Sequence, residues 1–419
     1  MSFQQGLSGL NTSSTNLDVI GNNIANVNTV GFKQSQAQFT DVFANSLSGS
    51  GSSQVGIGAK VATIAQTFSQ GNITQTNNPL DIAINGQGFF RMSDGGAISY
   101  SRDGQFRADG NGFITNSRGL NLTGYMADAS GNIIASGPTN LKLSTSDLAP
   151  KPTSSYAVGV NLDSRLDLPA VATFDATNPQ SYNKTTSGTV VDSLGNSHQF
   201  ALFFQKTAAN TWNTFATIDG KVDAAGLPIG VTLGGAASQA LQFDSTGAID
   251  PAATPFTVSI DLATINPTLG ATSPLDFTLD LTSSTQFGSD FGVNALTQDG
   301  YAPGRLAGFS TTADGIIQGN YTNGQTKTIG QIVLANFFNP QGLAPAGDGR
   351  WEETADSGQP VVGTPKSGPL GALQSSAVED ANVDLTHELV KMITAQRMYQ
   401  ANAKTIETQD TVLQTLVNL

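Results

Sequence analysis

Residues 100–125 read YSRDGQFRADGNGFITNSRGLNLTGY, a stretch in which turn dipeptides alternate with short runs of strand-forming residues. Asp-Gly and Asn-Gly pairs at 103–104, 109–110 and 111–112 lie between runs such as 105–108 and 120–125. Such pairs accept the positive φ angles of tight hairpin turns. Runs spaced by roughly ten residues are typical of sandwiches and barrels. The stretch therefore predicts a β domain, which we place at residues 71–145.

The same turn chemistry continues along the middle of the chain. Further Asp-Gly or Asn-Gly pairs lie at 94–95, 219–220, 299–300, 314–315, 323–324 and 348–349. Candidate strands of a second block lie near 187–191, 199–204, 211–217, 256–260 and 275–281. A Pro- and Ser-rich segment at 150–155 marks the start of this block, and residues 300–304 mark its end. We expect 146–299 to be an inserted outer β domain, and 71–145 with 300–375 to form one discontinuous inner β domain.

Both ends of the chain carry an apolar rhythm of three and four residues, which predicts one narrow stripe on each of two helices. The N-terminal stripe comprises Phe3, Leu7, Leu10, Leu17 and Ile24. The C-terminal stripe comprises Leu385, Leu389, Met392, Tyr399, Ile406 and Leu413. We expect residues 1–32 and 376–419 to form a helical, coiled-coil-like core. Residues 33–70, which include SLSGSGSS at 46–53, are expected to be a connector with a flexible part.

The predicted N-terminal helix is rich in Asn, Ser, Thr and Gly, which are poor helix formers. Burying its five apolar stripe residues returns roughly 8 to 15 kcal/mol. Ordering about 25 residues costs at least roughly 25 kcal/mol. We therefore expect this helix to be stable only against neighbours, including other copies of the chain. Apolar stripes more often pack within their own domain, and we expect the two stripes to pair both within one molecule and between molecules.

The composition excludes several classes of partner. Nineteen basic and 32 acidic residues give a net charge of −13, which disfavours binding to nucleic acid and to anionic membranes. The chain has no cysteine, so disulfides and thiolate sites are excluded. We find no apolar run long enough to cross a membrane, and the first basic residue is Lys33. We therefore predict neither membrane insertion nor a cleaved signal peptide.

Motifs that would carry chemistry are incomplete. His387 and Glu388 begin an HExxH-like pattern, but Lys391 occupies the position of the second histidine. The stretch DGNGF from Asp109 begins like a calcium loop, yet Leu120 stands where a bidentate acid is required. We expect no catalytic, cofactor-binding or metal site, and we predict that the protein is not an enzyme.

The stretch LDVIGNNIANVNTVGFK at 17–33 resembles the signature of flagellar rod, hook and hook-associated proteins. The segment PLDIAINGQGFF from Pro79, residues 100–125 and the C-terminal segment from Asn382 resemble the same family. The signature residues that match are Asn22, Asn23, Asn26, Asn28, Gly31, Phe32 and Lys33. Length and the inserted middle block resemble the hook members most.

This resemblance implies a subunit of the bacterial flagellar hook, a flexible helical tube that acts as a universal joint between rod and filament. It implies a tube of terminal helices inside, the discontinuous β domain in the middle and the inserted domain outside. It also implies type III export to the cell exterior. The expected partners are further copies of the chain, the export apparatus, and the distal rod, hook cap and hook–filament junction proteins. A distal rod subunit and, less favoured, a secreted β-rich adhesin remain alternatives.

Overall fold

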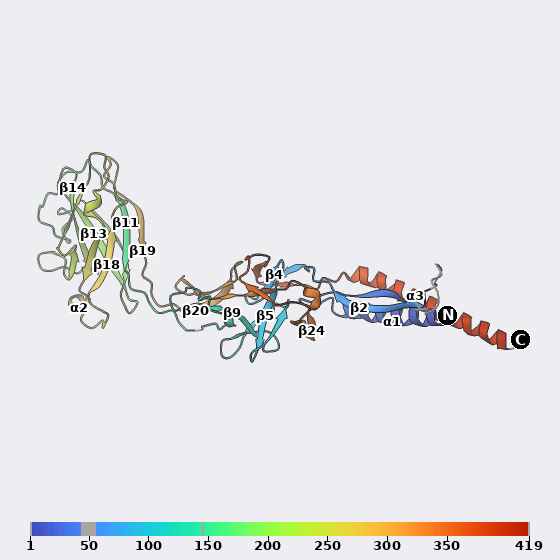
Figure 1. Ribbon diagram of the computed structural model, residues 1–419. Coiled ribbons are helices and arrows are strands. Elements are labelled where there is room, and N and C mark those ends of the chain that lie inside the picture. The colour runs from blue at the N-terminus through green and yellow to red at the C-terminus, as the bar shows by residue number, and fades with distance from the viewer. Residues whose placement is uncertain (1, 43–55, 145, 418–419) are drawn as a thin grey trace. The chain divides into compact units, whose positions relative to one another are not determined.

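The computed structural model describes residues 2–42, 56–144 and 146–417. The chain divides into two compact units. The first comprises 1–145, 307–320 and 326–419, and the second comprises 146–306 and 321–325. Most of the described secondary structure is strand, and the helices at the two ends of the chain contact each other (Figure 1). The prediction of a mainly β protein with interacting terminal helices is confirmed.

The first unit contains a large sheet that draws strands from two distant parts of the sequence. Strands from 89–140 pair with strands from 306–363, for example β9 with β22 and β5 with β23. Among the described residues this sheet has 13 strands: β5 (Phe89–Asp94), β6 (Ala97–Ser101), β7 (Arg107–Ala108), β8 (Ile114–Thr115), β9 (Asn121–Met126), β10 (Thr139–Asn140), β20 (Leu306–Thr311), β21 (Ile316–Tyr321), β22 (Thr326–Ile332), β23 (Leu334–Asn336), β24 (Ala344–Gly347), β25 (Arg350–Glu352) and β26 (Val361–Gly363). A short 3-10 helix, η2 (Pro340–Gly342), precedes β24.

Two small ladders join this sheet region to the segment before the C-terminal helix. They pair β4 (Ile82–Asn85) with β27 (Ala372–Ser375), and β3 (Ile73–Gln75) with β28 (Ala377–Glu379). One core cluster contains Ile82, Phe90, Leu122 and Ile332, all fully buried. A second, aromatic cluster centres on Phe89, Tyr100, Phe337 and Trp351, whose rings meet edge to face. Such edge contacts place the positive ring edge against a negative ring face.

The second unit is a β sandwich. One sheet has the order β15 (Val231–Leu233), β17 (Phe256–Ile260), β18 (Leu275–Asp280), β11 (Ser155–Asn161) and β19 (Gly292–Gln298). The other has the order β12 (Lys184–Val191), β13 (Ser197–Ala208), β14 (Thr211–Ile218) and β16 (Gln239–Gln242). A single core cluster is built from both sheets and includes Tyr156, Phe200, Trp212 and Phe277. The short elements η1 (Pro251–Ala253) and α2 (Leu262–Ile265) complete the unit.

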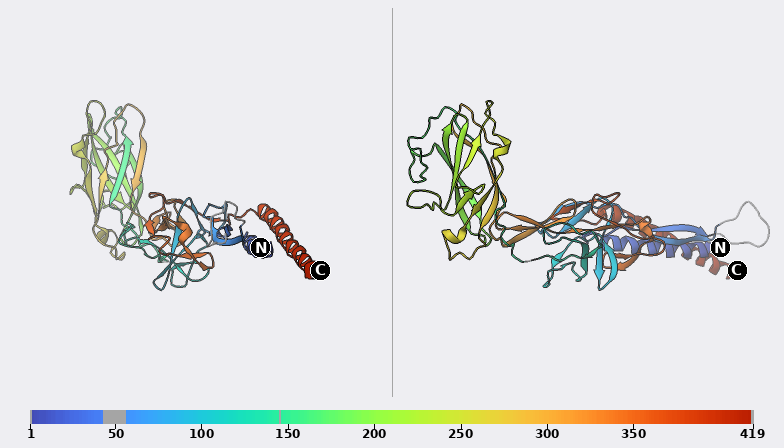
Figure 2. Two further views of the ribbon diagram at one scale, coloured as in Figure 1. Left: turned by 45° about the vertical axis from the view of Figure 1, so that its right-hand side comes forward. Right: turned by 60° about the vertical axis from the view of Figure 1, so that its left-hand side comes forward.

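The expected connector at 33–70 contains two strands among its described residues. β1 (Ser35–Val42) and β2 (Gly58–Gln66) form an antiparallel pair that lies against α1 (Ser2–Ala25) (Figure 2). About half of the side chains in each strand are exposed, and neither strand shows the strict alternation of buried and exposed residues that indicates a strand. The predicted flexible stretch 46–53 lies outside the described residues.

The second terminal helix, α3, spans Leu385–Val417 and begins at the first residue of the predicted C-terminal stripe, inside the expected domain range 376–419. β28 and the loop between β28 and α3 occupy the first part of the range 376–419. The strands predicted at 187–191, 199–204, 211–217, 256–260 and 275–281 are confirmed, whereas β11 and β19 were not predicted.

The turn dipeptides behave in two ways. Asp219-Gly220 and Asp348-Gly349 have positive φ at both residues, as predicted for hairpin turns. Asp103-Gly104 does not, and that prediction is wrong. Gly104 is instead required by close backbone packing, because a Cβ there would lie 1.7 Å from the carbonyl oxygen of Ile82. Asp299-Gly300 likewise has no positive φ angle. The Asp299 carboxylate instead accepts hydrogen bonds from the backbone nitrogens of Ser154 and Ser155.

Candidate assembly surface on the terminal helices

Helices α1 and α3 pack antiparallel and close together through small residues of α1. A Cβ on Gly6 would lie 2.9 Å from Cγ1 of Ile406, and a Cβ on Gly9 would lie 2.7 Å from Oδ1 of Asn402. At the other end of the pair, Asn23 meets Glu388. The contact face of α1 is therefore set by glycines that no sequence argument had singled out. A regular spacing of small residues was the available signal.

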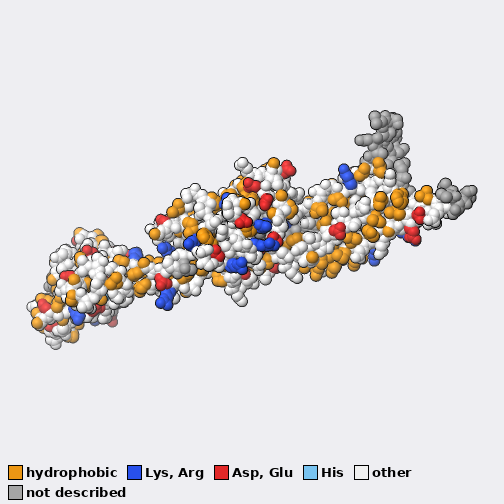
Figure 3. Space-filling view, turned by 90° about the horizontal axis from the view of Figure 1, so that it is seen from below, with side chains coloured by type: hydrophobic (Ala, Val, Ile, Leu, Met, Phe, Trp, Pro, Cys, Tyr) orange, Lys and Arg blue, Asp and Glu red, His pale blue; other side chains and the backbone are white. Residues whose placement is uncertain are grey.

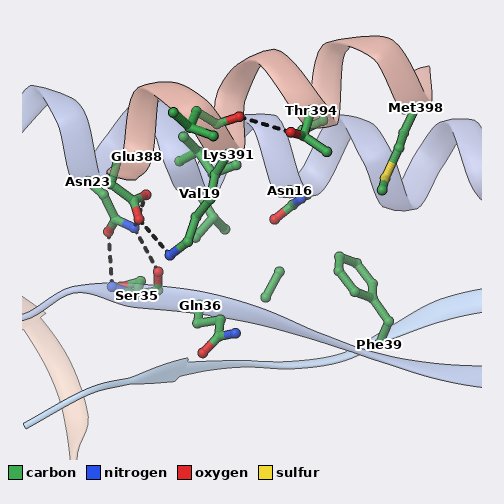
Figure 4. Close-up of a pocket in the computed structure, with 14 residues that line it drawn as sticks. Asn16, Val19, Asn23, Ser35, Gln36, Phe39, Glu388, Lys391, Thr394 and Met398 are labelled. Atoms are coloured by element: carbon green, nitrogen blue, oxygen red, sulfur yellow. Dashed lines mark hydrogen bonds and ion pairs between the residues drawn. The ribbon is translucent and has the colours of Figure 1, made fainter. Parts of the chain in front are cut away.

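Glu388 joins α1, α3 and β1 at a buried junction (Figure 4). Its carboxylate accepts hydrogen bonds from Asn23 Nδ2 at 3.1 Å, from Gln34 Nε2 at 2.7 Å and from Lys391 Nζ at 2.8 Å. Asn23 also exchanges hydrogen bonds with the backbone of Ser35, which fixes the start of β1. Burial by itself raises the pKa of Glu388, but the hydrogen bonds from Lys391 and Asn23 outweigh burial and hold the pKa below its ordinary value.

A second buried junction connects the segment after α1 to the β domain. Lys33 Nζ lies 2.7 Å from one carboxylate oxygen of Glu379, and Arg102 NH1 lies 3.0 Å from the other. Lys33 also donates to the carbonyl oxygen of Ser69. Burial lowers the pKa of Lys33 and of Arg102, and the negative charge of Glu379 opposes that shift for both cations. The three side chains come from distant parts of the sequence, so they fix how these parts meet.

The structure does not bring the two predicted apolar stripes together as one seam within the chain. Phe3, Leu7, Leu385, Leu389, Tyr399 and Leu413 are exposed, and Leu10, Leu17, Ile24, Met392 and Ile406 are partly buried. Leu7 and Leu389 are both 45% exposed. The intrachain face of α1 uses Gly6, Gly9, Ser13 and Ile20 instead. Most stripe residues therefore remain open on the helices, where hydrophobic side chains gather (Figure 3).

A groove of about 360 Å³ lies between α1, β1 and α3 (Figure 4). Its apolar lining includes Val19, Ile20, Phe39, Val390 and Met398. Phe39, Val390 and Met398 are exposed in the chain. Within the described residues, no cluster of His, Asp or Glu is arranged to hold a metal ion. None of the described helices is long and apolar enough to span a membrane.

Four protein-domain families match successive regions of this chain. They are the flagella basal body rod protein at 3–33, the flagellar hook protein FlgE/F/G D1 domain at 83–163, the flagellar basal body protein FlaE D2 domain at 161–301, and the flagellar basal body rod FlgEFG protein C-terminal region at 374–419. The flagellar hook protein FlgE of Escherichia coli K12 is 43% identical over the whole length of both chains. The chain belongs to the flagellar hook protein family.

Other hook proteins extend this similarity across distant bacteria. FlgE of Salmonella typhimurium is 44% identical over all of both chains, and FlgE of Borreliella burgdorferi is 34% identical over all of this chain and 99% of its own. The crystal structure of flagellar hook protein FlgE2 from Helicobacter pylori superposes with a TM-score of 0.53, covering 73% of this chain and all of that one. At 14% identity that likeness concerns the fold alone. Hook proteins are structural, so the prediction that the chain is not an enzyme is confirmed.

The signature residues of this hook family member divide between the junctions and the surface. Asn23, Gly31 and Lys33 are buried, Asn26 and Phe32 are partly buried, and Asn22 and Asn28 are exposed. Gly31 has φ of 70°, and a Cβ there would lie 2.5 Å from the backbone nitrogen of Asp103. Only glycine fits both constraints. The contacts of Glu379 with Lys33 and of Glu388 with Asn23 were not predicted, because the two residues of each pair are more than 300 positions apart in sequence.

Proposed function

We propose that this chain is the structural subunit of the bacterial flagellar hook. It polymerises into a flexible helical tube that transmits torque from the rod to the filament. The observation that carries this proposal is the full-length identity of 43% with a hook protein, which spans both terminal helices and both β regions. A distal rod subunit is not favoured, because the relatives that match along the whole chain are hook proteins.

The helices supply the physical reason to assemble. Packing within one chain leaves Leu7, Leu389 and Leu413 exposed, and each large apolar side chain gains roughly 1.5 to 3 kcal/mol when fully buried. A contact between two different surfaces of one subunit does not close into a dimer, and its repetition generates a helical filament. The stripes from Phe3 to Ile24 and from Leu385 to Leu413 are therefore proposed to meet between copies in the wall of the tube.

In this proposal the terminal helices form a coiled inner tube, the β domain of 71–145 and 300–375 forms a middle layer, and the inserted block 146–299 faces outward. Two features support the arrangement: both terminal helices lie together at one end of the first unit, and the second unit has a core of its own (Figure 1). Polar β surfaces can slide at little cost, which allows bending, while the packed helices resist twist.

Family membership supports the remaining expectations, which we propose together. The subunit reaches the cell exterior through the flagellar type III export apparatus without a cleaved signal peptide. At its two ends the tube contacts distal rod proteins and hook–filament junction proteins, and a cap protein assists growth.

Electron microscopy of concentrated purified chain tests the proposal, with curved tubes as the expected result. Leu389→Asp should abolish tubes while the monomer stays folded, because Leu389 is exposed before assembly and a carboxylate would be buried unpaired after it. Ile406→Asp should also abolish tubes, but Ile406 additionally contacts Gly6 in its own chain. The matched control is Thr408→Asp, an exposed position off the stripe. Straight tubes would favour the rod alternative, and no tubes from the unaltered chain would refute polymerisation.

A further inference from the structure

Phe338, in the loop between β23 and η2, is 99% exposed. Its neighbour Phe337 is buried in the aromatic cluster, with ring centroids 4.7 Å from Tyr100 and 6.0 Å from Phe89. The chain thus directs one phenylalanine fully into the core and the next fully into solvent. Single exposed aliphatic residues are common, but packing among the described residues gives no reason for a large aromatic ring that is 99% exposed.

The loop that carries Phe338 is held in place on its far side. Asn339 Nδ2 donates to the carbonyl oxygen of Asp356 at 3.0 Å, and Thr354 Oγ1 donates to the carbonyl oxygen of Gly342 at 2.6 Å. Gly342 lies so close to the backbone at 356–357 that a Cβ would be 2.5 Å away. Little backbone freedom is left to lose on binding, so Phe338 is a preorganised anchor. Val361, opposite Asn336 in the β23–β26 ladder, is also exposed.

The same unit contains a hollow of suitable chemistry. It has a volume of about 540 Å³, and Phe32, Pro345 and Trp351 provide its aromatic and apolar lining. Arg350 also lines it, and its Nε is buried without a hydrogen-bond partner among the described residues. The ion pair from Arg350 to Asp348 is long, at 3.8 Å. A guanidinium with so few partners is available to lie over an aromatic ring, a favourable cation–π arrangement.

We infer that Phe338 of one subunit inserts into the hollow lined by Phe32, Pro345, Arg350 and Trp351 on a second copy of this chain. This inference rests on the proposed polymerisation. Phe338 and the hollow are different surfaces of one compact unit, so their contact is head to tail and propagates without closing. Phe338 lies in the β domain, and the hollow lies in the same domain and at its junction with the segment after α1. In a helical polymer each layer of a subunit lies against the same layer of its neighbours. The contact is thus separate from that of the helical stripes.

Photo-crosslinking tests this contact directly. We replace Phe338 with p-benzoylphenylalanine, assemble tubes and irradiate them. The expected product is a covalent dimer whose second attachment site, mapped by mass spectrometry, lies in the peptide 345–351 or at Phe32. The same probe at Leu168, an exposed residue of the second unit, is the matched control and should give no product at the hollow. Attachment elsewhere in intact tubes, or no attachment, overturns the inference.

Substitutions provide the second readout. Phe338→Ser should raise the critical concentration for assembly roughly tenfold or more, as expected for an aromatic anchor. Phe338→Tyr should preserve assembly, and so should Leu168→Ser. Thr29→Trp should weaken assembly from the other side, because Thr29 is exposed and lines the hollow. If the unaltered chain forms no tubes, the proposed function fails; if tubes form equally well with Phe338→Ser, only the Phe338 contact is refuted.

Discussion

Lys33 Nζ lies 2.7 Å from Glu379 Oε1, and both side chains are completely shielded from solvent. Arg102 binds the second oxygen of the same carboxylate at 3.0 Å. Desolvating three charges offsets much of their mutual attraction, so such a network contributes little net stability. Its geometry is nevertheless demanding, because each member must be in place for the others to remain paired. The network therefore specifies how the segment after α1 joins the β domain.

Removing the shared carboxylate should be far more damaging than its net contribution suggests. Glu379→Gln leaves two buried cations without a counter-charge, and we expect a loss of about 3 to 5 kcal/mol in the unfolding free energy of the first unit. Urea unfolding followed by Trp351 fluorescence in a Trp212→Phe background measures this unit, since Trp212 belongs to the second.

The control is Glu407→Gln, which removes a pair with Lys404 in which both side chains are exposed. Exposed pairs contribute little, so the unfolding midpoint should not change. Equal midpoints for Glu379→Gln and the unaltered chain would show that the buried network is not needed for the joint.

Helix packing should depend on glycine at position 9. Gly9→Val places a branched side chain where even a Cβ is 2.7 Å from Oδ1 of Asn402, so the Asn402 side chain must leave its contact with Ser13 and the packing of α1 against α3 loosens. We expect hydrogen exchange in α1 to accelerate at least tenfold and tubes to be lost. Gly21→Ala is the matched control, because no atom lies within 4 Å of the added Cβ, and it should stabilise α1 by about 0.5 to 1 kcal/mol. Unchanged exchange in Gly9→Val would contradict the close packing.

Acid should loosen the α1–α3 junction through Glu388. Its pKa is lower in the folded chain than the ordinary value of about 4.3, so the unfolded chain binds the proton more readily. The stabilisation is therefore complete above that ordinary value and is lost as pH falls through the depressed pKa. Hydrogen exchange of α3 amides near Glu388 should accelerate as the pH falls below about 5, beyond the intrinsic pH effect.

The variant Glu388→Gln distinguishes the acid sensitivity caused by Glu388 from that caused by the other carboxylates. The variant should be less stable at neutral pH and should lose most of the acid-dependent change at the junction. An identical pH profile in the variant and the unaltered chain would assign the acid sensitivity to a different group.

The β architecture was largely predictable because its signals are local. Asp219-Gly220 and Asp348-Gly349 adopt the turn conformation that their residue types favour. Runs such as 199–204 carry dense apolar and aromatic residues that fill a sandwich core. β1 and β2 escaped prediction because buried and exposed side chains do not alternate along them, so no pattern of period two marks them.

The assembly surface was only partly predictable. Apolar spacing located the stripes containing Leu7 and Leu389, but spacing does not say which face of a helix meets its own chain. That choice is made by Gly6 and Gly9, through contacts with residues nearly 400 positions away. The contacts of Glu379 with Lys33 and of Glu388 with Asn23 were missed for the same reason, since partners so distant in sequence are identified only by three-dimensional proximity.

The second unit should be removable at a natural boundary. The backbone groups of Lys151 and Tyr301 hydrogen-bond to each other in both directions at 3.0 Å, and β11 and β19 continue this pairing into the sandwich. Replacing residues 152–300 by a short Gly-Ser linker should therefore leave the first unit folded, with unchanged Trp351 fluorescence. If this block forms the outer layer, the shortened chain should still form tubes, but these should be straighter than normal in electron micrographs. Loss of folding would show that the first unit depends on the second, and tubes of normal curvature would exclude a role for the block in bending.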